Sequence, residues 1–445
     1  MYKIQPIDAS EISSIINGKL HGINSKVEHV STDTREEFLP NTAYFALKGV
    51  KFDGNSFISE AIKKRSSLII SNVDIEDKVP HIVVNNSTIA LGNIAKHLTK
   101  NVRKIGITGS VGKTTVKEMA HLVLSERYNV IKTNKNENNE IGVPITLLKA
   151  INNDFCVVEM GMRGPNEIRY LSNICEPEAS IITNVGTSHL EKLKSEENIF
   201  KAKMEILENT KKLAIIPYDK RFLNYNYDKI IPIFVGKDIR YCELKYTDHG
   251  MEFSVDYFGE KINGFNIEGF NLCNVTNALF AVAIGKNYQV PNDSIIEGLN
   301  KFKSENLHGE IVIIKGITII LDCYNASYES VKASLFSLKK YSEIKRKTSY
   351  LLLGDMLEIG EKSEEFHYRI GELAKDLSIK NVFATGTYAK NTLDGFIGGE
   401  LVENDMSLSE KILASLGEND VILVKGSRKM KLEKIIEQMK EKSNE

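Results

Sequence analysis

The sequence of 445 residues has few cysteines, and none of them stands at the spacing of a pair. No CxxC occurs, and the five cysteines are scattered singly along the chain: Cys156, Cys175, Cys242, Cys273 and Cys323. An odd, unclustered set argues against a disulfide framework and against a structural zinc site. We therefore expect a protein of a reducing compartment.

Long apolar runs are also missing. The longest apolar stretch, around Ile311–Leu321, is interrupted by Lys315 and Gly316. It is far too short to cross a bilayer. The first residues, MYKIQPIDASEISS, lack the apolar core of a signal peptide. These absences predict a cytoplasmic protein that makes no contact with a membrane.

Neither sign of charge is in excess. The chain has 58 basic and 59 acidic residues, which gives a net charge of −1. Nucleic-acid binding needs a clustered excess of Lys and Arg, so no nucleic-acid partner is expected. An anionic substrate would have to be held by local charge.

The length and the order of apolar runs predict three α/β domains. We expect them at residues 1–100, 101–307 and 308–445. In the second and third, strand-like apolar runs alternate with helices, which is typical of parallel βα units. The main expected strands are 43–47, 67–70, 81–84, 104–108, 155–159, 179–184, 213–217, 318–322, 349–353, 381–385 and 420–425.

A glycine-rich segment follows the expected strand 104–108 and opens a helix that runs through Val116–Ser125. In that context, converging backbone N–H groups and the helix N-terminus bind phosphate. Lys113 would reach the β- and γ-phosphates, and the Thr114 hydroxyl would ligate Mg²⁺. The strict GxxxxGK[ST] spacing is not met, because Ile107 stands at its first glycine. The expected nucleotide-binding residues are Thr108, Gly109, Ser110, Val111, Gly112, Lys113, Thr114 and Thr115.

Two further side chains follow expected strands. Glu159 ends the run Phe155–Glu159, and His189 follows strand 179–184. Ligands of open α/β sheets collect at the carboxyl ends of the strands, so Glu159 is a candidate to hold Mg²⁺. A solvated glutamate is the plainer alternative. The role of His189 does not follow from ligand preference, because Mg²⁺ favours oxygen.

Lys203 falls on the apolar face of an expected helix at residues 196–209. It is four residues after Ile199 and three before Ile206, which places it among buried positions. A lysine held against apolar surface either extends its ammonium to water or loses its charge. A neutral amine can react with CO₂ to give an anionic carbamate, which is an oxygen ligand suited to Mg²⁺.

In this order, the motifs resemble those of the Mur ligase family over essentially the whole chain. The segments that carry the resemblance are Thr108-Gly-Ser-Val-Gly-Lys-Thr-Thr115, Thr133-Asn-Lys-Asn-Glu-Asn-Asn-Glu-Ile-Gly-Val-Pro144, Val158-Glu-Met-Gly-Met-Arg-Gly-Pro165, Thr183-Asn-Val-Gly186 and Lys201-Ala-Lys-Met-Glu-Ile206. The second and third are most similar to the member that adds D-alanyl-D-alanine. No DNPR tetrapeptide, expected of the sibling that adds the third residue, occurs.

The ends of the sequence agree with this resemblance. Ser31-Thr-Asp-Thr-Arg35 is similar to the part of the family's N-terminal domain that holds a UDP-sugar. Asp322-Cys-Tyr-Asn-Ala326 and Leu423-Val-Lys-Gly-Ser-Arg428 resemble the family's last domain. On their own, Asp33 and Arg35 could form an ordinary surface turn.

The resemblance implies an ATP-dependent ligase that forms an amide bond between UDP-N-acetylmuramoyl-tripeptide and D-alanyl-D-alanine in peptidoglycan precursor synthesis. It implies a UDP-sugar-binding domain, a central P-loop ATPase-like domain with a parallel sheet, and a Rossmann-like last domain. It assigns Thr114 and Glu159 to one Mg²⁺, and His189 and a carbamylated Lys203 to a second. The remaining implied contacts are Asn274, Asn277, His308 and Asp322 for the nucleotide, and Ser31, Asp33, Arg35, Asn138 and Asn139 for the substrate.

Several positions depart from the family pattern. His308 stands where an arginine of the nucleotide site is usual, and a histidine is shorter and only partly charged near neutrality. Cys273 replaces a histidine, Leu321 replaces an acid, Ser327-Tyr328 replaces Asn-Pro, and Asn41 stands at a turn glycine. The expected metal and phosphate residues are all present, so these changes do not imply loss of the chemistry.

Other readings stay open on the sequence. A ligase that joins glutamates to folate would share the central loop but would not need a UDP-sugar domain. The departures at His308 and Cys273 also leave open a paralogue with another amine acceptor, or a non-catalytic paralogue that binds the UDP-sugar. Whether the tripeptide ends in lysine or diaminopimelate is undetermined, and we expect a monomer. Residues 425–428 and 355–361 are candidates to read D-alanyl-D-alanine.

Overall fold

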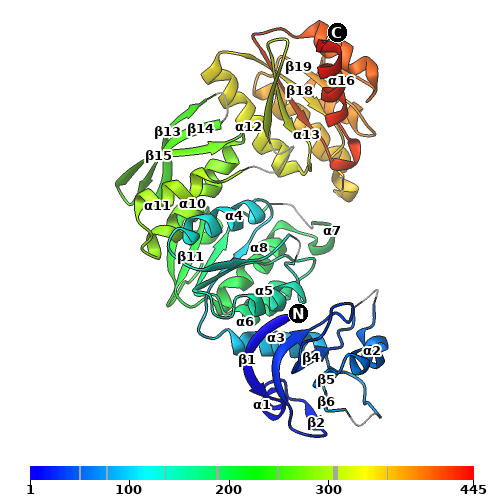
Figure 1. Cartoon of the computed structure of the whole chain (residues 1–445). Coiled ribbons are helices and arrows are strands. Elements are labelled where there is room, and N and C mark those ends of the chain that lie inside the picture. Colours follow the sequence, from blue (N-terminus) through cyan, green and yellow to red (C-terminus); the bar gives the residue numbers. More distant parts are fainter. Residues whose placement is uncertain are drawn as a thin grey trace.

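The computed structural model describes residues 1–49, 52–76, 79–135, 137–186, 190–247, 250–303, 309–357 and 359–444. The chain folds into three α/β domains, each built around its own sheet, stacked along one axis (Figure 1). The N-terminal domain lies at one end of the stack and the C-terminal domain at the other. None of the described helices is both long and apolar enough to span a membrane.

The N-terminal domain has a mixed six-stranded sheet of order β1-β3-β4-β5-β6-β2. Its central strands β3 to β6 are parallel, and β1 and β2 close the two edges in antiparallel pairs. The elements are β1 (Tyr2–Asp8), α1 (Ala9–Ile15), β2 (Lys19–His21), β3 (Lys26–Ser31), β4 (Thr42–Phe45), a 3₁₀ turn (Gly54–Phe57), α2 (Ile58–Lys63), β5 (Leu68–Ser71), β6 (His81–Val83) and α3 (Ser87–Leu98).

The central domain has a nine-stranded sheet of order β15-β14-β13-β12-β11-β10-β7-β9-β8. Its strands are β7 (Arg103–Thr108), β8 (Val130–Lys132), β9 (Phe155–Glu159), β10 (Ala179–Ile182), β11 (Leu213–Pro217), β12 (Ile231–Val235), β13 (Ile239–Tyr246), β14 (Gly250–Tyr257) and β15 (Glu260–Glu268). Its helices are α4 (Lys113–Ser125), α5 (Gly142–Lys149), α6 (Glu167–Cys175), α7 (Leu190–Leu193), α8 (Glu196–Met204), a 3₁₀ turn (Glu205–Asn209), α9 (Lys220–Leu223), α10 (Leu272–Asn287) and α11 (Asn292–Asn300).

Strand β9 shows why the middle of this sheet reads as an unbroken apolar run. Phe155 and Val157 point into one core, which they share with α4 and α10, while Cys156 and Val158 point into a second core on the other face. A strand that is buried on both faces needs apolar residues at every position. Helix α4 in turn buries Val116, Ala120 and Val123, the spacing of one helical face.

The C-terminal domain has a six-stranded sheet of order β16-β17-β21-β18-β19-β20, parallel apart from the β16–β17 hairpin. Its elements are β16 (Glu310–Ile314), β17 (Ile317–Asp322), α12 (Tyr328–Lys345), β18 (Thr348–Leu353), a 3₁₀ turn (Gly360–Lys362), α13 (Ser363–Asp376), β19 (Asn381–Ala384), α14 (Ala389–Phe396), β20 (Glu400–Leu401), α15 (Met406–Ser415), β21 (Asp420–Lys425), a 3₁₀ turn (Arg428–Met430) and α16 (Glu433–Asn444).

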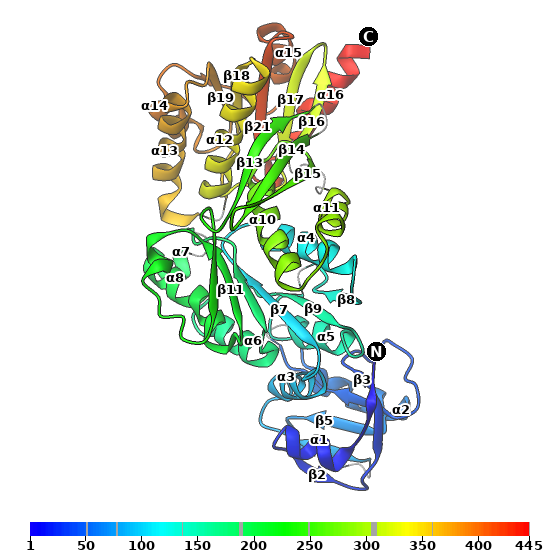
Figure 2. The ribbon, with the colours of Figure 1, turned by 90° about the vertical axis from the view of Figure 1, so that its left-hand side faces the viewer.

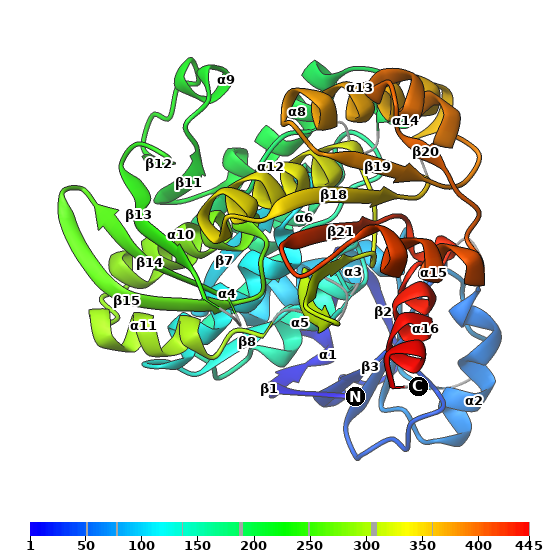
Figure 3. The same ribbon diagram turned by 90° about the horizontal axis from the view of Figure 1, so that it is seen from above.

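Apolar contacts join the three domains. Helix α3 of the first domain packs on α5 and α6 of the second, and their buried residues form one core. At the other end, strands β13 to β15 extend from the central domain toward α12 (Figures 2 and 3). Tyr341 of α12 lies edge-on to Tyr246 and Phe270, with ring centroids 5.1 and 6.1 Å away.

The expected elements agree with the structure at most positions, with two corrections. The central sheet is not parallel throughout, because β13, β14 and β15 are joined antiparallel. The helix expected at residues 196–209 ends as α8 at Met204 and continues as a 3₁₀ turn. The last turn tightens to a 3₁₀ geometry, which is frequent at helix ends.

Candidate active site

Three neighbouring strands of the central sheet end at the same edge. Their order is β10-β7-β9, and all are parallel, so their carboxyl ends meet. The glycine-rich loop follows β7, Glu159 ends β9, and Thr183 follows β10. This edge is where ligands bind in open α/β sheets.

The glycine-rich loop is held in place by the segment after β10. The Asn184 side chain accepts a hydrogen bond from Val111 N at 3.1 Å and donates one to Val111 O at 3.0 Å. Gly186 N donates to Ser110 Oγ at 2.9 Å. Gly112 has a φ of +82°, and a Cβ there would lie 2.8 Å from the Asn277 side chain. The loop therefore requires glycine at position 112, and the side chain of Asn184 holds the loop through its hydrogen bonds to Val111.

Replacing Asn184 with alanine is expected to weaken ATP binding more than turnover. The change removes two hydrogen bonds of the loop, each worth about 1 kcal/mol, so the loop must be ordered by the nucleotide itself. We expect KM for ATP to rise by up to about thirtyfold, with kcat changed less than threefold. Asn226→Ala is the control, because its two side-chain hydrogen bonds, both with Asp228, are exposed. An unchanged KM for ATP would show that Asn184 does not order the loop.

Lys113 is the first residue of α4, and its ammonium turns back onto the loop. Nζ donates to Gly109 O at 2.8 Å and to Ser110 O at 3.3 Å. Burial lowers the pKa of Lys113, and the nearby Glu159 carboxylate partly opposes that effect. Phosphate oxygens at this loop would be stronger acceptors than these two neutral carbonyls, because both partners would then carry charge.

Glu159 is almost fully buried, at 3% exposure, and its two oxygens have different partners. Thr114 Oγ1 donates to Oε2 at 3.0 Å, and Asn138 Nδ2 donates to Oε1 at 3.0 Å. The Glu159 backbone N–H donates to Thr133 Oγ1 at 3.0 Å. A carboxylate and a hydroxyl side by side are oxygen donors of the kind that Mg²⁺ prefers.

Lys117 also contacts this carboxylate and was not expected from the sequence. It is 1% exposed, and its Nζ lies 3.6 Å from Glu159 Oε2 and 3.3 Å from Glu118 Oε1. The ammonium neutralises part of the buried negative charge, which fixes the orientation of Glu159. Its position one turn after Lys113, between buried residues of α4, is the signal that would have identified it.

Lys203 lies on α8 and is 1% exposed, so its side chain does not extend to water. Burial lowers the pKa of Lys203 well below that of a free lysine, and the positive charge of Lys113 lowers it further. The structure thus brings Lys113, Thr114, Glu159 and Lys203 to one region. His189 and His308, which were also expected at this site, lie outside the described residues.

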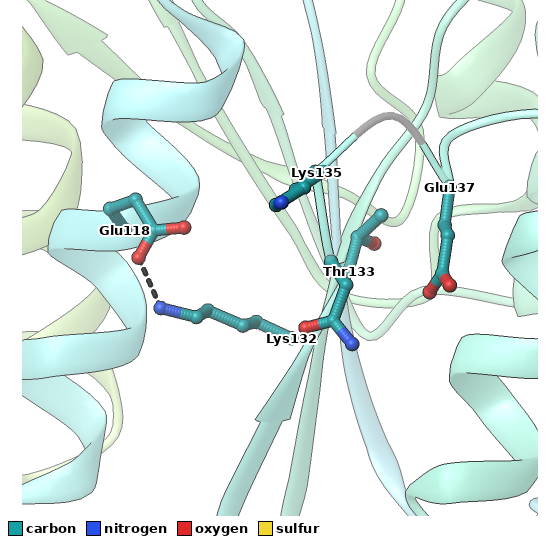
Figure 4. Close-up of a pocket in the computed structure, with 6 residues that line it drawn as sticks. Glu118, Lys132, Thr133, Lys135 and Glu137 are labelled. Atoms are coloured by element: carbon teal, nitrogen blue, oxygen red, sulfur yellow. Dashed lines mark hydrogen bonds and ion pairs between the residues drawn. The ribbon is translucent and has the colours of Figure 1, made fainter. Parts of the chain in front are cut away.

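A pocket opens between Glu118 of α4 and the segment that follows β8 (Figure 4). Lys132 reaches across it to form an ion pair with Glu118, and Lys135 points from the opposite loop toward α4. Glu137 lines its far side. Asn139 lies in the same loop, and its Oδ1 accepts from Gly142 N at 2.9 Å at the start of α5. The lining therefore carries two lysines, Lys132 and Lys135, and two glutamates, Glu118 and Glu137.

The expected substrate residues of the N-terminal domain form a compact turn after β3. Arg35 binds Asp33 through Nε and Nη2, with Nε 2.9 Å from Oδ1, and this ion pair lowers the pKa of Asp33 to about 2. The Ser31 hydroxyl donates to Asp33 O at 3.2 Å. The Arg35 side chain is 88% exposed, so its remaining N–H groups face solvent.

Comparison with known proteins identifies the family. Residues 107–285 match the Mur ligase middle domain, and residues 308–428 match the Mur ligase glutamate ligase domain. A UDP-N-acetylmuramoyl-tripeptide–D-alanyl-D-alanine ligase of Buchnera aphidicola is 33% identical over 450 residues, which cover 97% of this chain and 98% of that protein. The chain belongs to the Mur ligase family.

Solved structures of Mur ligases have the same three-domain fold. MurF from Acinetobacter baumannii is 25% identical, with a TM-score of 0.82 over 98% of this chain and all of that one. MurF ligase from Thermotoga maritima, solved in complex with ADP, is 25% identical with a TM-score of 0.78 over 94% of this chain and 98% of that one.

In this Mur ligase, Asp322 is buried rather than open to solvent. It ends β17 at 3% exposure, and Lys425 Nζ lies 2.8 Å from its Oδ2. Ser334 Oγ donates to the same oxygen. Cys273 lies nearby, and burial followed by the Asp322 charge raises the pKa of its thiol to about 11. A neutral thiol therefore stands at the junction of the central and C-terminal domains.

The departure at Asn41 is explained by its backbone. Asn41 has a φ of +60°, in the left-handed region that usually requires glycine. Asparagine is among the few other residues that adopt this conformation readily. The turn before β4 is therefore preserved without the family's glycine.

Proposed function

We propose that this Mur ligase uses ATP to join D-alanyl-D-alanine to UDP-N-acetylmuramoyl-tripeptide in peptidoglycan precursor synthesis. One observation carries the proposal: Lys113, Thr114, Glu159 and Lys203 meet at one sheet edge of a chain that matches such a ligase along nearly its whole length. The ADP bound to the Thermotoga maritima relative supports ATP as the energy source.

The chemistry must give a carboxylate a better leaving group. The terminal carboxylate of the tripeptide attacks the γ-phosphorus of ATP, and an acyl phosphate and ADP result. The amine of D-alanyl-D-alanine then attacks the acyl carbon, loses a proton, and expels phosphate. Lys113 would neutralise charge on the transferred phosphoryl group, which is the main electrostatic task of such reactions. Closure of three domains around three substrates would exclude water from the acyl phosphate.

Two Mg²⁺ ions are proposed at this edge. Thr114 and Glu159 would hold one, and their oxygens already lie 3.0 Å apart with Glu159 kept in place by Asn138 and Lys117. His189 and a carbamylated Lys203 would hold the other. Bound Mg²⁺ would draw charge from the phosphate oxygens of ATP.

The surroundings of Lys203 fit a carbamate. Its lowered pKa leaves more neutral amine, the form that reacts with CO₂ and releases one proton. The charge of Lys113 disfavours an ammonium at Lys203, but it attracts an anion at the same place. Both effects favour the carbamate over a free lysine.

Substrate contacts are proposed for the other expected residues. Arg35, Asp33 and Ser31 would contact the UDP-sugar, since the turn presents the free N–H groups of Arg35 to solvent. Asn138 and Asn139 would lie near the peptide end. Asn274 and Asn277 are nearly buried on α10, and Asn277 lies beside Gly112. Both would meet the nucleotide, as would His308 and Asp322. Asp322 would have to exchange part of its contact with Lys425 to do so.

We also propose domains at residues 1–100, 101–307 and 308–445, a cytoplasmic location and a monomeric state. The three separate sheets support this division, since each range contains the strands of one sheet.

Phosphate release from ATP tests the function. We expect release only when UDP-N-acetylmuramoyl-tripeptide and D-alanyl-D-alanine are both present, with a product heavier by one dipeptide. Lysine- and diaminopimelate-containing tripeptides are compared in parallel, and a folate serves as the control acceptor. Incorporation of another amine in place of the dipeptide would show that D-alanyl-D-alanine is not the acceptor. Binding of the UDP-sugar without any turnover would favour a non-catalytic paralogue.

A further inference from the structure

A group of two histidines and an aspartate lies in the N-terminal domain, away from the catalytic edge. His21 ends β2 and His81 begins β6, and the two are direct partners across this antiparallel pair. Their rings are stacked with centroids 4.8 Å apart. Asp74 follows β5 and reaches the same place. One ligand atom from each of His21, Asp74 and His81 lies within 4.8 Å of the others.

The two contacts of His81 cannot both be satisfied by a neutral imidazole. Nδ1 lies 2.9 Å from Val79 O, and Nε2 lies 3.2 Å from Asp74 Oδ1. A carbonyl and a carboxylate can only accept, but a neutral imidazole has one N–H. Either tautomer therefore leaves one contact between two acceptors. An additional proton on the ring, or a cation between Nε2 and the carboxylate, resolves this.

The distance between His81 Nε2 and Asp74 Oδ1 fits a cation bound between them. Ligands about 2.0–2.1 Å from a tetrahedral Zn²⁺ lie about 3.3 Å from each other, close to the observed separation of Nε2 and Oδ1. The Nδ1–H to Val79 O contact is the kind of outer hydrogen bond that orients a metal-binding histidine and leaves Nε2 free. His81 is 4% exposed, whereas Asp74 is exposed and gives the ion access.

His21 completes the set from the edge strand. Gly22 follows it with a φ of +89°, and a Cβ there would be 3.2 Å from Pro80 Cα, so the ends of β2 and β6 are held close. The stacked ring of His21 must rotate about its Cβ–Cγ bond to aim a nitrogen at the ion. Its partial exposure leaves room for that rotation.

We propose that His21, Asp74 and His81 form a binding site for a divalent transition-metal ion of the Zn²⁺ type, with water as the fourth ligand. The site uses histidine and aspartate, so the scatter of the cysteines does not bear on it. A site with two imidazole ligands suits Zn²⁺ better than Mg²⁺. The ion would fasten the three-residue edge strand β2 to the loop before β6.

Titration of Zn²⁺ into the metal-free full-length protein by calorimetry tests the proposal. We expect the parent to bind one Zn²⁺ more than His21→Ala, and Asp74→Asn to bind that ion at least about tenfold more weakly, because even outer-shell changes cost 10–100-fold. His97→Ala is the matched control, since the His97 ring pairs with Glu11 at 3.8 Å and is not part of the His21–Asp74–His81 group. It should bind as the parent does.

Zn²⁺ bound at the catalytic edge would be counted equally in the parent and in His21→Ala. The difference between the two stoichiometries therefore reports only the proposed site. Co²⁺ should give a tetrahedral visible absorption band in the parent that His21→Ala lacks. Equal stoichiometry and affinity in the parent and His21→Ala would overturn the proposal. The rate at which His21→Ala forms the amide product should equal that of the parent. The outcome of the metal titration therefore does not depend on the proposed function.

Discussion

Replacing Lys113 with alanine is expected to abolish ligation and leave the fold intact. Lys113 is the only glycine-rich-loop side chain with a positive charge, and its Nζ lies among the loop carbonyls where phosphate oxygens are expected. Loss of one preorganised group that stabilises a transition state costs about 10²–10³ in kcat. Because Lys113 would place a full charge beside a triphosphate, its loss should reduce kcat by at least that factor. Phosphate release with both substrates present measures the effect.

Two comparisons make this result specific. Lys201→Ala changes a lysine of α8 whose partner, Glu197, is 62% exposed, and it should leave kcat unchanged. Lys113→Arg keeps the charge but not the size, so it should recover only part of the activity. Thermal unfolding of each variant shows whether the fold persists. Turnover of Lys113→Ala at the parental rate would contradict the assignment of the phosphate loop.

The central features of this site could be predicted because their signals are local. The glycine-rich loop is continuous in sequence between a strand and a helix. Lys203 was indicated by helical spacing alone, and its 1% exposure agrees with that prediction. The same spacing places Lys117 on the buried face of α4, but its partner Glu159 ends strand β9. The contact between them depends on the register of β7 with β9, which the sequence does not encode locally.

Long-range pairing explains the features that could not be predicted. Lys425 reaches Asp322 across 103 residues, because β21 inserts beside β17 in the sheet. The antiparallel β14–β15 hairpin turns at Phe258 and Gly259, both with positive φ. Such turns favour Asn-Gly or Asp-Gly, and a phenylalanine there conceals the signal. The pairing of β14 with β15 imposes this turn, although phenylalanine rarely adopts a positive φ.

Replacing Lys203 with alanine is the second change with a large expected effect. If the lysine is carbamylated and supplies oxygen to a metal ion, its loss should reduce kcat by at least about 10–100-fold, the range for outer-shell changes at metal sites. Short carboxylic acids such as acetate should restore part of the activity, because they bring a carboxylate into the space left by the side chain. Bicarbonate alone should not, since alanine has no amine to carbamylate.

The sign of the charge that rescues activity decides what Lys203 contributes. An anionic carbamate is replaced by acetate, whereas a cationic lysine would be replaced by methylammonium. The neighbouring Lys113 charge, which lowers the pKa of Lys203, should favour the anion. In ¹³C NMR, labelled bicarbonate should give a carbamate signal in the parent that is absent from Lys203→Ala and declines as the pH falls, because protons reverse the reaction. Rescue by methylammonium but not acetate, or an alanine variant as active as the parent, would exclude the carbamate.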